Sequence, residues 1–68
     1  MRITVENQAL QRAIVEGGLT IQKLTDTARV SKGTIRRALR GEGILPSSYR
    51  RLNIALGGKL DDYAAVMD

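Results

Sequence analysis

Basic side chains gather in one stretch of this 68-residue sequence. Seven of its eleven lysines and arginines lie between positions 29 and 51, where Glu42 is the only acidic residue. A one-sided cluster of cations favours a polyanionic partner, because a helix that is merely solvated usually interleaves both signs of charge. The seven residues are Arg29, Lys32, Arg36, Arg37, Arg40, Arg50 and Arg51.

Residue types that catalyse reactions or hold metals are scarce. The chain has no histidine and no cysteine, which removes the commonest metal ligand, the commonest general base and any disulfide framework. The carboxylates form no motif, and "GEGILP" (41–46) lacks the lysine of a phosphate-cradling loop. We therefore expect no enzyme, no metal or cofactor and no small-molecule ligand. With neither a membrane-length apolar run nor a signal-peptide pattern, we expect a cytoplasmic, nucleoid-associated protein.

Glycines and capping residues divide the first two thirds of the chain into three helical blocks. Apolar residues recur at helical spacing over about 5–16, and the glycine pair at 17–18 ends that helix. Thr20 is a good N-cap for a second helix over 21–28. Ser31 is placed to cap a third helix over 32–40, which Gly41 ends.

The remaining third predicts two more helices. Ser47 is expected to cap a fourth helix that runs to about residue 56, and a short fifth helix is expected over 60–66. "MRITVE" (1–6) is interpreted as a frayed lead-in to the first helix, with a short strand as the alternative, because no partner strand is visible. The prediction is an all-α fold: one compact domain of four to five helices over residues 1–68.

The third expected helix has two different faces. Ile35, Ala38 and Leu39 fall within one arc, and the cations fall on the opposite side together with Gly33. Repulsion between cations one turn apart costs a few tenths of a kcal/mol per pair, and DNA phosphate would supply the missing counter-charge. Gly33 either leaves room for a base edge or only weakens the helix. Two helices joined by a tight turn are the arrangement that places a recognition helix in the major groove.

"LTIQKLTDTARVSKGTIRRALRG" (19–41) resembles the helix-turn-helix of the phage repressor and Cro family. Its second half is also similar to the start of Lac-repressor-type headpieces. The helix before the motif, the loop at 41–46 and "LNIALGGKLDDY" (52–63) extend the first resemblance over nearly the whole chain. The resemblance implies a lambda-repressor-like DNA-binding domain over residues 1–68, with the motif at about 20–41.

Matched position by position, the resemblance also implies which residues bind. It implies base contacts at Lys32, Gly33, Arg36 and Arg37. It implies phosphate contacts at Thr20, Ile21, Ser31, Thr34, Arg40, Ser47 and Ser48. For Arg50 and Arg51, a solvated helix face and a phosphate contact both stay open. A possible dimer interface comprises Ile44, Leu45, Leu60, Tyr63, Val66 and Met67, with packing of the apolar pair at 44–45 on the core as the alternative.

Three departures from the family pattern bear on packing. Thr25 stands where the family prefers alanine, so its hydroxyl needs a backbone carbonyl or costs about 1–3 kcal/mol. Arg29 stands where the turn usually has a glycine in the left-handed conformation. Ile14 and Leu39 replace a buried Arg–Glu pair of many relatives, and we predict that they touch.

The main expectation is a sequence-specific regulator of transcription that binds double-stranded DNA. It would act as a repressor, bound as a homodimer to a near-palindromic operator through the recognition helix at 32–40. No membrane partner is expected. The alternative is a protein-interaction module, such as an antitoxin or antirepressor, that uses the apolar loop and the C-terminal helix on the same scaffold.

Overall fold

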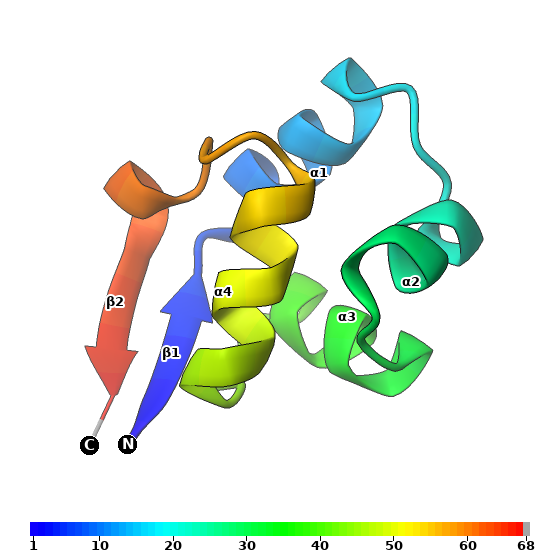
Figure 1. The fold of residues 1–68 in the computed structure, drawn as a ribbon. Coiled ribbons are helices and arrows are strands. Elements are labelled where there is room, and N and C mark those ends of the chain that lie inside the picture. Colours follow the sequence, from blue (N-terminus) through cyan, green and yellow to red (C-terminus); the bar gives the residue numbers. More distant parts are fainter. Residues whose placement is uncertain (68) are drawn as a thin grey trace.

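The two ends of the chain pair in a small sheet, and four helices lie between them (Figure 1). The structure is a computed structural model that describes residues 1–67. In chain order the elements are β1 (Arg2–Val5), α1 (Asn7–Glu16), α2 (Ile21–Ala28), α3 (Lys32–Leu39), α4 (Pro46–Ala55), the 3-10 turn η1 (Asp61–Tyr63) and β2 (Ala64–Met67).

The sheet brings together the start and the end of the described chain. β1 pairs antiparallel with β2, so that Arg2 faces Met67 and Val5 faces Ala64. At the other edge of β1, the backbone of Ile3 exchanges two hydrogen bonds with Ile44, at 2.8 and 2.9 Å. β1 therefore lies between β2 and the loop that precedes α4.

This sheet overturns two predictions. The fold is a small α+β domain, so the all-α prediction is wrong, and the strand alternative for residues 1–6 is the one observed. The expected fifth helix over 60–66 is also wrong, because only η1 is helical there and β2 follows it. The two alanines of "AAVM" favour a helix locally. Pairing with β1, some sixty residues away, overrides that preference. A local sequence pattern does not indicate a partner strand so distant in the chain.

The core is filled by aliphatic side chains from every helix and from the loops. Thirteen buried apolar residues form one cluster, and its largest fully buried members are Leu10, Leu24, Ile35, Ile44, Leu52 and Leu60. Ile14 is buried in this cluster and Leu39 packs against it half-buried. Their direct contact stays a prediction. α1 and α3 are also joined by a hydrogen bond from the Asn7 side-chain amide to the Leu39 carbonyl.

Two of the three expected N-caps are confirmed. The Thr20 hydroxyl accepts from the Lys23 amide and the Ser31 hydroxyl accepts from the Thr34 amide, each at 3.1 Å. The cap at Ser47 is wrong, since the N-cap is Leu45 and α4 begins at Pro46, two residues earlier than a cap at Ser47 implies. Proline suits the first helical position because it has no N–H group to leave unpaired there.

Two features of α2 and of the turn that follows it are unfavourable for stability. Arg29 closes α2 in the left-handed conformation, at φ 59° and ψ 44°, and is the one non-glycine residue with a positive φ in residues 1–67. The Thr25 hydroxyl is buried and has no hydrogen-bond partner within those residues. The left-handed backbone at Arg29 and the unpaired hydroxyl of Thr25 each destabilise the folded chain.

Candidate nucleic-acid interface

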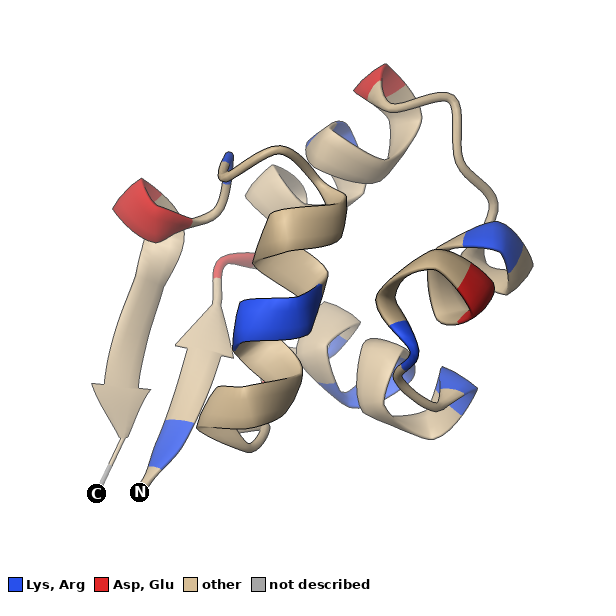
Figure 2. Cartoon of the chain, in the orientation of Figure 1, with Lys and Arg blue, Asp and Glu red and all other residues tan. Residues whose placement is uncertain are grey.

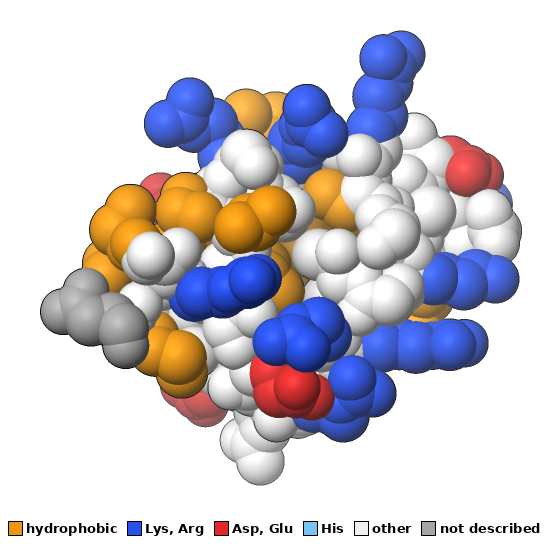
Figure 3. Space-filling view, turned by 90° about the horizontal axis from the view of Figure 1, so that it is seen from below, with side chains coloured by type: hydrophobic (Ala, Val, Ile, Leu, Met, Phe, Trp, Pro, Cys, Tyr) orange, Lys and Arg blue, Asp and Glu red, His pale blue; other side chains and the backbone are white. Residues whose placement is uncertain are grey.

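α3 presents a cationic face to solvent and an apolar face to the core. Ile35 and Ala38 are fully buried, whereas Lys32, Gly33 and Arg36 are exposed. Blue segments mark the basic residues of α3 along the lower part of the molecule (Figure 2). Seen from below, the surface carries many Lys and Arg side chains and few acidic ones (Figure 3). Lys32 and Arg36 form no ion pair within residues 1–67, so their charges stay available for a ligand.

The N-terminus of α3 is organised by two hydroxyls. In addition to capping the Thr34 amide, the Ser31 hydroxyl lies 2.9 Å from the Thr34 hydroxyl. This arrangement fixes the start of the helix beside Lys32 and Gly33. A Cβ at Gly33 would meet only the Ser31 Oγ, at the ordinary contact distance of 3.8 Å. The fold therefore does not require glycine at this position, and the space over the helix backbone is open.

The starts of α2 and α4 offer two further anion sites. At α2, Thr20 is exposed and its hydroxyl has a proton to donate while it accepts from the Lys23 amide. At α4, the N-cap Leu45 has no side chain that caps the first turn, which leaves the amides of Ser47 and Ser48 at an uncapped helix start. Unpaired N–H groups and the helix dipole favour negative charge at such positions.

Arg37 and Arg40 are not free cations in this structure. The Glu42 carboxylate lies between them, 3.3 Å from Arg37 Nη1 and 2.5 Å from Arg40 Nε. Arg37 Nη2 also donates to the Gly43 carbonyl at 3.3 Å. The hydrogen bond from Arg40 and the nearby positive charges hold the pKa of Glu42 below its usual value. Glu42 was visible in the sequence as the one acid of the basic stretch, but its spacing from Arg37 did not predict this pairing.

The expected dimer interface divides into exposed and buried members. Leu45, Tyr63, Val66 and Met67 are between 44 and 62% exposed. Ile44 is 2% exposed and bonded to Ile3, and Leu60 is 0% exposed with its amide donating to the Asn53 side chain. Assigning Ile44 and Leu60 to an interface is therefore wrong, because folding of the single chain already covers them.

Arg50 and Arg51 lie on the exposed side of α4. Arg51 Nη1 donates to the Arg29 carbonyl at 3.4 Å, so it ties α4 to the turn after α2. In residues 1–67, the structure contains no cluster of acidic residues that would hold a metal ion and no helix long and apolar enough to cross a membrane.

Neither the known protein-family models nor the curated proteins nor the solved structures contain a match to this chain. The resemblance to the phage repressor and Cro family accordingly stays a prediction from the sequence.

Proposed function

We propose that this chain is a sequence-specific, DNA-binding regulator of transcription with α3 as its recognition helix. The observation that carries the proposal is the exposed pair of Lys32 and Arg36 on α3, opposite the buried Ile35 and Ala38. A row of like charges destabilises an isolated helix. The phosphates of DNA offset that repulsion, and a helix held by a preceding helix and a tight turn fits the major groove.

Base edges and phosphates would be bound by different groups. Arg36 is long enough to donate two hydrogen bonds to guanine O6 and N7, and Lys32 to donate one. The open space at Gly33 admits a base edge or a thymine methyl. Phosphates would be held by the helix starts at Thr20, Ile21, Ser31, Thr34, Ser47 and Ser48, where backbone amides and hydroxyls converge.

Arg37 and Arg40 would also contact DNA, although both contact Glu42 in the free protein. Arg40 uses only its Nε for this pair and keeps its other N–H groups for a phosphate. Arg37 donates to both Glu42 and the Gly43 carbonyl, so it would exchange these partners to present its two Nη groups to a base. The Glu42 carboxylate also repels phosphate. This repulsion would lower the affinity for non-specific DNA more than the affinity for a site that offers hydrogen-bond acceptors to both arginines. Glu42 thus favours discrimination between DNA sequences.

A homodimer would cover four of the exposed apolar side chains. Leu45, Tyr63, Val66 and Met67 would be covered by a second copy, and two recognition helices would then enter successive major grooves about 34 Å apart. Such a dimer would repress by occupying an operator that overlaps a promoter.

Selection of bound duplexes from a random DNA pool tests this proposal. We expect enrichment of an inverted repeat whose half-sites are spaced by about one helical turn, roughly 10–10.5 base pairs. A pool that stays random would contradict sequence-specific binding. Enrichment of single half-sites alone would contradict the dimer and leave the recognition helix intact.

The second candidate function is a protein-interaction module, and the same four exposed apolar residues favour it. Titration with random duplex at low salt separates the two candidates. The regulator binds random duplex with a strong dependence on salt. Absence of that binding would favour the protein-interaction module.

A further inference from the structure

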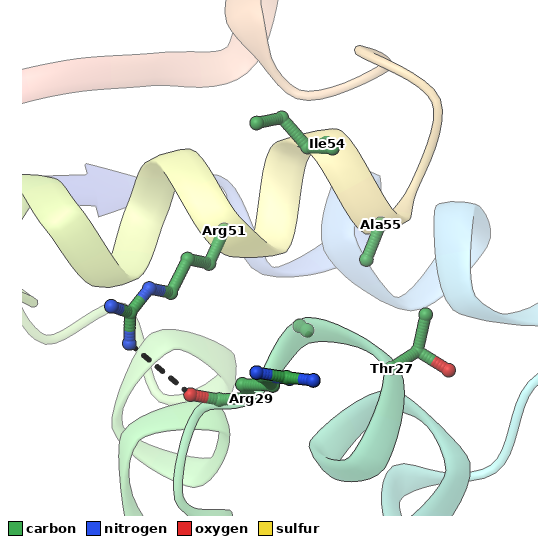
Figure 4. Close-up of a pocket in the computed structure, with 6 residues that line it drawn as sticks. Thr27, Arg29, Arg51, Ile54 and Ala55 are labelled. Atoms are coloured by element: carbon green, nitrogen blue, oxygen red, sulfur yellow. Dashed lines mark hydrogen bonds between the residues drawn. The ribbon is translucent and has the colours of Figure 1, made fainter.

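A hollow of about 800 Å³ lies between α2 and α4, beside the turn at Arg29 (Figure 4). α3 contributes no residue to its lining, so the hollow is separate from the proposed recognition face. The lining residues are Thr27, Ala28, Arg29, Arg51, Ile54 and Ala55.

The lining combines cations with apolar surface and contains no acid. Arg51 reaches from α4 toward the turn, where its Nη1 donates to the Arg29 carbonyl (Figure 4). This single bond positions the Arg51 guanidinium and leaves its other N–H groups for a ligand. Ala55 is half-buried and points toward α2, whereas the side chain of Ile54, which is 72% exposed, projects from the other side of α4 (Figure 4).

Arg29 adopts a left-handed backbone conformation that destabilises any residue with a Cβ. A side chain strains the left-handed backbone there, and glycine would adopt the same conformation without strain. The fold uses the Arg29 carbonyl, which accepts from Arg51, whereas the Arg29 guanidinium forms no ion pair or hydrogen bond within residues 1–67. Strained residues of this kind concentrate at functional sites.

We propose that this hollow docks an acidic segment of another protein. A carboxylate of the segment would lie between Arg29 and Arg51, and a neighbouring apolar side chain would pack over Ala55. Charge complementarity identifies the acid, and the apolar lining at Ala28 and Ala55 identifies the apolar neighbour, for which a phosphate backbone has no counterpart. The hollow is open rather than enclosed, which suits a protein segment better than a small molecule. The proposal does not depend on DNA binding.

The test uses Arg29→Gly, a variant that keeps the backbone conformation and loses the guanidinium. Glycine adopts this left-handed conformation without strain, so we expect the variant to melt at or above the temperature of the natural chain, and unfolding then cannot account for a loss of binding. The probe is a short synthetic peptide that alternates glutamate and leucine, titrated into the isotope-labelled chain and followed by amide chemical shifts. Lys59→Ala, which removes an exposed cation from the turn after α4, is the matched control.

We expect shifts confined to the lining residues and about tenfold weaker peptide binding by Arg29→Gly, with Lys59→Ala unchanged. Shifts spread over α3, equal binding by all three proteins or no shifts at all would each overturn the proposal. Random duplex is titrated in parallel. An equal loss of duplex and peptide binding by Arg29→Gly would identify the hollow as a phosphate contact instead. Failure of duplex binding by the natural chain contradicts the proposed function alone.

Discussion

Thr25, in α2, has a buried hydroxyl group without a hydrogen-bond partner among residues 1–67. Its Oγ1 is the one buried side-chain polar atom in residues 1–67 without a hydrogen-bond partner. Thr25→Val keeps the shape of the side chain and removes that cost, so we expect the free energy of unfolding to rise by about 1 kcal/mol. Urea denaturation measures the change. Thr27→Val, at an exposed position on the same helix, should have little effect, and destabilisation by Thr25→Val would contradict the unpaired hydroxyl.

Substitution of Gly33 is expected to affect folding stability and DNA affinity in opposite directions. Alanine fits there without a clash and suits a helix better than glycine, so Gly33→Ala should stabilise the chain by roughly 0.5–1 kcal/mol. If a base edge approaches the backbone at this position, the added methyl group should lower the affinity for a selected operator more than for random duplex. Thermal denaturation and binding titrations measure the two effects. Unchanged operator affinity would show that Gly33 only weakens the helix.

Side-chain roles set by local spacing were predictable from the sequence. The caps at Thr20 and Ser31 and the buried positions of Ile35 and Ala38 follow from residue type and helical period. The pairing of Glu42 with Arg37 and Arg40 was not predictable, because it depends on how the loop after α3 folds back.

At the scale of elements, the turn from α4 to β2 is held by a polar cluster around Asp61. The Asp61 carboxylate accepts from the Tyr49 hydroxyl at 2.5 Å and from the Asn53 side chain at 2.8 Å. Asn53 in turn accepts from the Leu60 amide at 2.9 Å. These bonds direct the chain after α4 toward its pairing with β1.

The cluster predicts a dependence on alkaline pH. Burial, followed by the hydrogen bond to Asp61, raises the pKa of Tyr49 from 10.0 to about 12. The folded chain holds this proton more tightly than the unfolded chain does. Its contribution to stability is therefore complete below pH 10.0 and is lost as the pH rises through about 12. Ultraviolet titration should show a tyrosinate step near pH 12 that Tyr49→Phe lacks. Ionisation of Tyr49 near pH 10 would contradict the cluster.

The helices could be predicted from the sequence, whereas the sheet could not. Each helix carries its own period, cap or stop signal, so the four helices were predicted with errors of a residue or two at their ends. The sheet depends on pairing between residues 2–5 and 64–67, and only the folded chain brings these together. The same long-range packing buries Ile44 against β1, which is why its assignment to an interface failed.

The whole molecule presents three surfaces with different chemistry. The cationic face of α3, the exposed apolar side chains around β2 and the hollow between α2 and α4 involve different residues. On the proposed function, the first would bind DNA and the second would bind another copy of the chain. The hollow would bind an acidic protein segment, independently of that function. Because they are built from separate side chains, a substitution in one of them can be tested without removing the others.

The central claim is that α3 reads DNA sequence, and Arg36→Ala tests it most directly. Its affinity for a selected operator and for random duplex is compared with that of the natural chain, with Lys59→Ala as the control. Loss of a bidentate base contact should weaken operator binding by about 1–3 kcal/mol and random binding by much less. Lys59→Ala should retain the preference for the operator. Equal losses on both duplexes in Arg36→Ala would contradict sequence reading by α3.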